Sequence, residues 1–172
     1  MSMRSHKLTA RRLTLYGMMI ALAFVFSYLE HLIPFNIGIP GVKLGLGNIV
    51  VLLSLYTLGT SGAFLIAVLR ILLIGLTFGG MFSMFYSLAG GLLSFTIMAL
   101  LKRWKIFGVT GVSICGGVCH NVGQLIVAML VLETGSVWYY FPVLLVTGAL
   151  TGTAIGAAGA LMTARLQKYI HG

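Results

Sequence analysis

Arg70 is the residue in this sequence with the clearest capacity to bind a ligand. It lies between Leu69 and Ile71, inside a long apolar run. A guanidinium in hydrocarbon is costly, so such an arginine normally faces the interior of a helix bundle or a wet cavity and has a partner. Its planar fork suits a carboxylate or a phosphate. We interpret Arg70 as a ligand-binding residue. The alternative is a structural arginine that is satisfied by carbonyl groups or paired with Glu30 or Glu133.

A second polar group lies in the segment GGVCHNVGQ, residues 116–124. In a helix, with about 100° between successive residues, His120, Asn121 and Gln124 fall within one arc of about 100°. Such residues either recognise a ligand or hold neighbouring helices together by hydrogen bonds. A catalytic histidine would need a nucleophile or an orienting carboxylate, and the two glutamates lie at the ends of apolar runs. The pattern therefore favours ligand recognition over catalysis.

Residues 33–53, IPFNIGIPGVKLGLGNIVVLL, combine turn formers with one cation. Proline and glycine at this density interrupt regular structure and predict a loop. Lys43 lies in this loop, and Asn48 begins the next apolar run. We include both in the candidate binding set. An ordinary connection with one snorkelling lysine is an equally open interpretation.

The composition is that of an integral membrane protein. The 172 residues are 59% hydrophobic and only 8% charged, and their mean hydropathy is +1.08. Soluble domains carry about 25% charged residues. The formal net charge of +9 does not indicate nucleic-acid binding, because the cations lie at the ends of apolar runs, where they set topology and meet anionic lipid head groups.

The apolar runs predict a single all-α transmembrane domain, residues 1–172, made of six helices. Their expected limits are 13–32, 44–58, 62–78, 81–101, 109–132 and 138–164. Nine of the eleven Lys and Arg residues lie before the first helix, between the fourth and fifth, and after the sixth. By the positive-inside bias, both termini are then cytoplasmic. The first apolar run leads into a loop, so we expect no cleavable signal peptide.

The sequence lacks the residues that several kinds of chemistry require. The sequence contains no GxxxxGK[ST] phosphate-binding loop and no aspartate, so we expect neither ATP hydrolysis nor a carboxylate cluster for Mg²⁺. Cys115 and Cys119 lie one helical turn apart without further ligands, which is too little for a metal site. We therefore expect no metal, no cofactor and no catalytic residues.

Small residues four apart predict close helix packing. One such pair is Gly17 and Ala21 in the first helix, and a longer stripe runs through Gly148, Gly152 and Gly156 in the sixth. These stripes contain more small residues than six helices obviously need to pack against one another. Packing within the bundle and contact with another membrane protein both remain open.

Three segments together carry a resemblance to a known family: PGVKLGLGNIVVL, RILLIGLTFGGMFSMFYSLAGGLLS and GGVCHNVGQ. They resemble bacterial membrane proteins labelled heptaprenyl diphosphate synthase component I, also called the Gx transporter family, over about residues 13–164. That family is similar to the substrate-binding S components of energy-coupling factor (ECF) transporters. The resemblance implies a six-helix subunit of the bacterial plasma membrane that binds a vitamin or similar small molecule.

Transferred to this sequence, the resemblance gives each candidate a role. Residues 33–43 would cap the site, while Arg70, His120, Asn121 and Gln124 would line it. Gly17 and Ala21 would dock onto a transmembrane coupling subunit driven by two ATPases. The S components of ECF transporters usually have two alanines there, and Gly17 departs from that pattern.

We therefore expect a substrate-binding subunit of a vitamin- or flavin-type transporter, without its own ATPase. The alternative is the membrane accessory component of heptaprenyl diphosphate synthesis, for the menaquinone side chain. Without aspartate the chain is a poor candidate for a synthase acting alone. A purely structural scaffold would leave Arg70 unexplained. Lys43 and Arg70 favour an anionic ligand, although a neutral vitamin would also suit the amides, and the direction of transport stays open.

Overall fold

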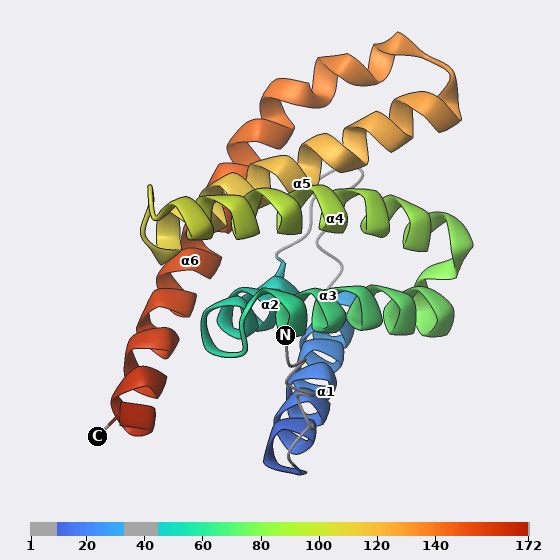
Figure 1. The fold of residues 1–172 in the computed structure, drawn as a ribbon. Coiled ribbons are helices and arrows are strands. Elements are labelled where there is room, and N and C mark those ends of the chain that lie inside the picture. The colour runs from blue at the N-terminus through green and yellow to red at the C-terminus, as the bar shows by residue number, and fades with distance from the viewer. Residues whose placement is uncertain (1–9, 33–44, 172) are drawn as a thin grey trace, which may run out of the picture.

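The computed structural model describes residues 10–32 and 45–171, and these residues form six α-helices and two short helices of other types. The α-helices are α1 (Ala10–Leu32), α2 (Leu46–Thr57), α3 (Thr60–Ile74), α4 (Gly80–Trp104), α5 (Val109–Leu132) and α6 (Phe141–His171) (Figure 1). A π-helix, η1 (Gly75–Gly79), joins α3 to α4, and a 3₁₀-helix, η2 (Gly135–Tyr140), precedes α6. No strand occurs in the described ranges, which confirms the predicted all-α class. The predicted loop 33–43, with Lys43, lies outside the described residues.

Within the described residues, four helical stretches are long and apolar enough to cross a membrane: Arg12–Leu32, Thr60–Trp104, Val109–Leu132 and Gly135–Leu166. This agrees with the prediction of a membrane protein. Helix α2 has 12 residues, about 18 Å at 1.5 Å per residue, and is thus shorter than a hydrocarbon core of about 30 Å. The number of crossings and the orientation of the termini remain predictions.

The longest apolar stretch, Thr60–Trp104, folds back on itself. Gly80 adopts the left-handed region with φ 69°, which glycine tolerates without steric cost. The chain therefore reverses at residues 79–80, and α3 and α4 form a hairpin (Figure 1). The predicted third and fourth helices, 62–78 and 81–101, lie on either side of these glycines.

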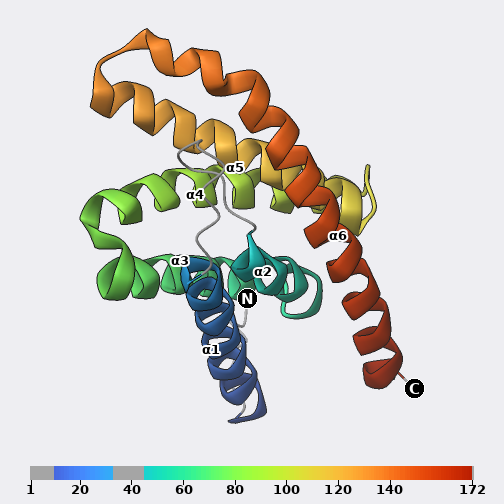
Figure 2. The same ribbon diagram turned by 180° about the vertical axis from the view of Figure 1, so that it is seen from behind.

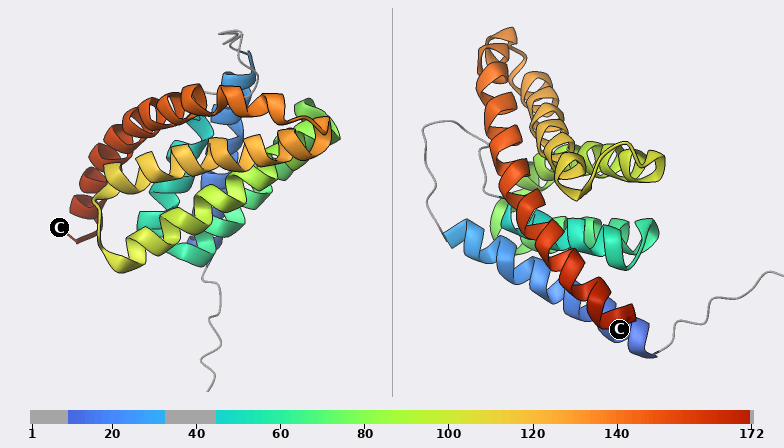
Figure 3. Two further views of the ribbon diagram at one scale, coloured as in Figure 1. Left: turned by 90° about the horizontal axis from the view of Figure 1, so that it is seen from above. Right: turned by 90° about the vertical axis from the view of Figure 1, so that its left-hand side faces the viewer.

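The helices form two groups that meet across a shared core. Helices α1, α2 and α3 contact one another, while α4 lies along α5 and α5 along α6. Helix α6 extends from the second group past α2, as Figure 2 and both views in Figure 3 show. Leu166 of α6 packs against the buried side chains that α1 shares with α2.

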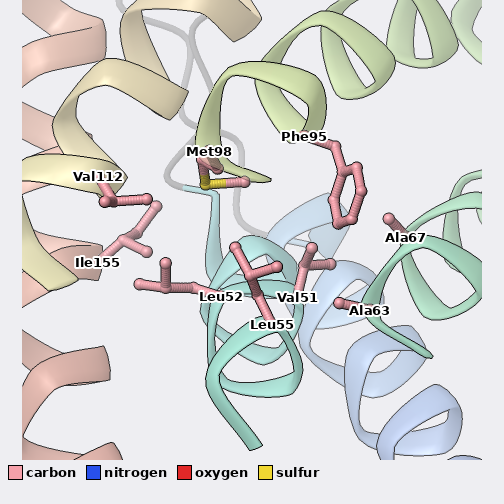
Figure 4. Packing of buried hydrophobic residues seen from close by; sticks show 9 residues of the cluster. All are labelled: Val51, Leu52, Leu55, Ala63, Ala67, Phe95, Met98, Val112 and Ile155. Carbon is pink, nitrogen blue, oxygen red and sulfur yellow. The ribbon is translucent and has the colours of Figure 1, made fainter. Parts of the chain in front are cut away.

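The core between the two groups is built around the apolar face of α2. Val51, Leu52 and Leu55 of α2 are at most 3% exposed. Figure 4 shows the cluster that they form with residues of α3, α4, α5 and α6, namely Ala63, Ala67, Phe95, Met98, Val112 and Ile155. Although α2 is short, it therefore fixes where its neighbours lie.

Helices α4, α5 and α6 approach one another through glycines. A Cβ placed on Gly152 would come within 2.7 Å of the Cα of Ile114, and one on Gly123 within 2.9 Å of the Cα of Gly90. A Cβ on Gly117 would meet the carbonyl oxygen of Gly148. The glycine stripe of α6 is thus used inside the protein, against α5.

Candidate ligand-binding site

Arg70 lies on α3 and is 9% exposed. Its Nη2 donates a hydrogen bond of 2.8 Å to Oδ1 of Asn48 at the start of α2. Its Nη1 donates one of 3.3 Å to the hydroxyl of Ser27 on α1. One guanidinium thus connects three helices, and both of its hydrogen-bond partners are neutral.

Glu30 was one of the two acids expected to pair with Arg70, and it follows Ser27 by three residues on α1. Within the described residues, however, the two groups form no ion pair. The Glu30 carboxylate instead accepts a hydrogen bond of 2.5 Å from the backbone N–H of Gly45. Gly45 is the N-cap of α2 with φ 73°, and an anion at a helix N-terminus is favoured by the helix dipole. The other acid, Glu133, is exposed at the end of α5.

Gly47 provides the space in which the guanidinium lies. A Cβ at this position would collide with Oγ of Ser27 and with Nη1 of Arg70. Any other residue at position 47 would therefore displace the side chains that hold Arg70. The first turn of α2 contributes both this space and the Asn48 acceptor.

The Nε atom of Arg70 is buried and has no hydrogen-bond partner. A guanidinium has five N–H donors and no acceptor, and its contacts here are to one hydroxyl and one amide oxygen. An unmade hydrogen bond of a buried charged group is unfavourable. The cluster of Arg70, Asn48, Ser27, Glu30 and Gly47, which we call the Arg70 cluster, therefore retains unused capacity to bind an acceptor.

Aromatic side chains lie next to the Arg70 cluster along α1. Tyr28, Phe24 and His31 surround Phe78 of η1, with ring centroids 4.8, 6.1 and 5.9 Å from it. Tyr28 and His31 directly follow Ser27 and Glu30 in the chain. These rings connect α1 to the end of the α3 segment that carries Arg70.

The three polar residues of α5 lie in a different environment. Asn121 donates a hydrogen bond of 2.7 Å to the carbonyl oxygen of Leu144 on α6. Gln124 is 1% exposed, and neither of its amide atoms has a hydrogen-bond partner. Gly90 of α4 lies against Gln124 and His120, because a Cβ there would come within 2.8 Å of the Gln124 Cγ and 2.7 Å of the His120 carbonyl oxygen.

The structure thus brings Arg70 and Asn48 together and places the α5 residues at the contacts with α4 and α6. No hydrogen bond joins Arg70 to Asn121 or Gln124 in the described part of the chain. Asn121 holds α5 to α6, as in the alternative interpretation of this motif. A single pocket lined by all of these residues remains a prediction, as does the contribution of Lys43.

Sequence reasoning did not identify Ser27 as a partner of Arg70 and named Glu30 only as a possible one. A signal was available, since Ser27 and Glu30 are three residues apart and such residues share one face of a helix.

Gly17 and Ala21, the predicted docking pair, are both exposed on α1. No side chain would meet a Cβ added to Gly17, because nothing lies within 4 Å of it.

Comparison with known families identifies one match. The model of the family described as heptaprenyl diphosphate synthase component I matches residues 19–162, most of the chain. No curated protein and no solved structure matches the sequence. The match covers the Arg70 cluster and the polar residues of α5, and it confirms the family indicated by the three sequence segments. The chain belongs to the heptaprenyl diphosphate synthase component I family.

Proposed function

We propose that this chain is a membrane-embedded substrate-binding subunit that holds a small anionic ligand at the Arg70 cluster. The observation that carries this proposal is the buried guanidinium, which has an unpartnered Nε atom and, among the described residues, only neutral hydrogen-bond partners. Charge-assisted hydrogen bonds to a carboxylate or phosphate are about twice as strong as neutral ones. An anion at this place would use the donor capacity that the protein leaves unused.

The predicted topology would add further residues to this site. Six transmembrane helices with cytoplasmic termini would place Lys43 and the loop around it over the ligand. His120, Asn121 and Gln124 would recognise its polar atoms. The exposed pair Gly17 and Ala21 would dock onto a coupling subunit with ATPases, as in ECF transporters. The exposure of this pair supports the docking role.

The family description supports a second candidate function. A component I of a heptaprenyl diphosphate synthase implies a second subunit, and this chain would be its membrane accessory for the menaquinone side chain. Arg70 would then bind a diphosphate. Because Mg²⁺ on a diphosphate is held by carboxylates, the absence of aspartate argues that the chemistry would belong to the other subunit.

Mass spectrometry of the small molecules retained by the detergent-purified protein tests both candidates. Wild type is compared with Arg70→Ala, and Arg12→Ala serves as the control because Arg12 is an exposed cation on α1. We expect wild type and the control to retain an anionic small molecule that Arg70→Ala loses. Equal retention by all three proteins would contradict binding at Arg70.

The chemical identity of the retained molecule separates the two functions. A vitamin or flavin derivative supports the binding subunit of a transporter, whereas a prenyl diphosphate supports the synthase accessory.

Replacing Gly17 by Leu tests docking separately. We expect this variant to keep its ligand and to lose co-purifying membrane subunits, and unchanged co-purification would exclude this face as the docking site.

A further inference from the structure

A hollow of about 670 Å³ lies between the start of α3 and the end of α4, away from the Arg70 cluster. Its size is within the range of small-ligand sites, about 300–1,000 Å³. Three cations lie along one side of it, Lys102, Arg103 and Lys105, and no acid is among the residues that line it. The hollow is therefore positively charged at the end of two adjacent apolar helices.

The hollow is also lined by apolar side chains. Phe64 of α3 and Phe95 of α4 lie with their ring centroids 5.5 Å apart, and Phe95 is buried. Phe64 is 45% exposed and Leu100 38% exposed, so these two side chains are open to the surroundings of the helices. Both helices belong to a stretch that is apolar enough to cross a membrane, and in a membrane these surroundings would be lipid chains.

The three cations differ in how they are held. Lys102 donates a hydrogen bond to the carbonyl oxygen of Leu55, and its ammonium lies 5.0 Å from the centre of the Tyr56 ring. Arg103 and Lys105 are exposed, and their side chains form no hydrogen bond or ion pair with any described residue. Lys102 thus connects α4 to α2, and the other two cations are free to bind an anion.

We propose that this hollow binds an anionic phospholipid, with its phosphate head at Arg103 and Lys105 and one acyl chain along Phe64, Phe95 and Leu100. Charge complementarity selects the head, and the exposed side chains of Phe64 and Leu100 select an occupant with an apolar tail. Cations in the last turn of α4 also complement its helix dipole. The dipole does not explain, however, why Arg103 and Lys105 line a hollow that continues into an apolar wall.

The test uses the full chain reconstituted in vesicles of phosphatidylcholine with a minor fraction of phosphatidylglycerol, followed by native mass spectrometry of the extracted protein. The double variant Arg103→Gln/Lys105→Gln is compared with Arg12→Gln/Arg165→Gln, which removes two exposed cations outside the hollow. Each cation near an anionic lipid contributes about fivefold to binding. We therefore expect retention of phosphatidylglycerol relative to phosphatidylcholine to fall by at least about tenfold in the first variant and to stay near wild type in the second.

Two additional measurements distinguish a bound phospholipid from a phosphate ion held by the cations alone. Ala99→Trp fills the apolar side while keeping every cation, and it should also reduce phosphatidylglycerol retention in protein whose thermal unfolding is unchanged. Inorganic phosphate added in excess should not displace the lipid. Equal losses in the two double variants, or displacement by phosphate alone, would overturn the proposal.

Discussion

Helices α4–α6 and helices α1–α3 are held together in different ways. In the first group, glycines of one helix meet the backbone of the next, as Gly152 meets Ile114 and Gly123 meets Gly90. In the second group, an apolar cluster spans all three helices, and the Arg70 side chain adds hydrogen bonds that join the same helices. Close packing of backbones allows van der Waals contact along whole helices, whereas a buried guanidinium costs free energy unless it is satisfied.

This difference indicates which group serves as scaffold and which as site. The contacts of α4–α6 named above join backbone to backbone, so a side chain added there has to push two helices apart. In the Arg70 cluster, Gly47 leaves room for the guanidinium, whose Nε atom has no hydrogen-bond partner. A substitution in the first group should therefore change stability, and one in the second should change ligand binding.

The largest effect on stability is expected from Gly117→Ala. The added methyl group would meet the carbonyl oxygen of Gly148 and lie 3.3 Å from the Cα of Gly152, so α5 and α6 would have to move apart. We expect a loss of about 3 kcal/mol in the free energy of unfolding, the upper part of the usual range for overpacking. The measurement is unfolding in mixed detergent with increasing SDS.

Gly17→Ala is the control for this prediction, because it adds the same methyl group to a helix where nothing lies within 4 Å. Its free energy of unfolding should be unchanged or slightly higher, since alanine favours helix over glycine by up to about 1 kcal/mol. Similar losses in both variants would mean that the α5–α6 contact is not as close as described.

Gly47→Ala should have a smaller effect on stability and a larger one on function. Its methyl group would meet the ends of the Ser27 and Arg70 side chains, which can rotate, so we expect a loss of only about 1 kcal/mol. The displaced guanidinium should bind its ligand more weakly, by about tenfold if one charge-assisted hydrogen bond is lost. Ligand retention measured beside SDS unfolding checks both values, and unchanged retention would separate Gly47 from the site.

The sequence alone was sufficient for the all-α class, the membrane character and the family. The class and the membrane character follow from composition and from long apolar runs, because a chain in lipid must satisfy its backbone hydrogen bonds internally, as a helix does. The family was indicated by its resemblance in three sequence segments. Arg70 could be singled out because a charge inside such a run needs a partner.

The partners themselves could not be predicted. Whether Asn121 faces a ligand or the Leu144 carbonyl depends on the rotation of α5 against α6, and the polar pattern fits both orientations. Ser27 is one of many hydroxyl groups in the apolar runs, and only the crossing of α1 with α3 makes it a neighbour of Arg70. Gly47 has no side chain whose chemistry would indicate a role, and its role depends on the Ser27 and Arg70 side chains that lie against it.

The smallest expected effect is also the most direct comparison of the two groups. A double-mutant cycle of Asn48→Ala with Arg70→Met should show a coupling energy of about 0.6 kcal/mol, the typical value for a hydrogen bond between transmembrane helices, and no more than about 1.7 kcal/mol. The matched cycle of Asn121→Ala with Arg70→Met should show additive losses within about 0.5 kcal/mol, as for residues without a shared partner. Both cycles use SDS unfolding of the same protein without ligand. Coupling of equal size in the second cycle would mean that α3 and α5 share one polar network, and the Arg70 cluster would then have to be extended to the residues of α5.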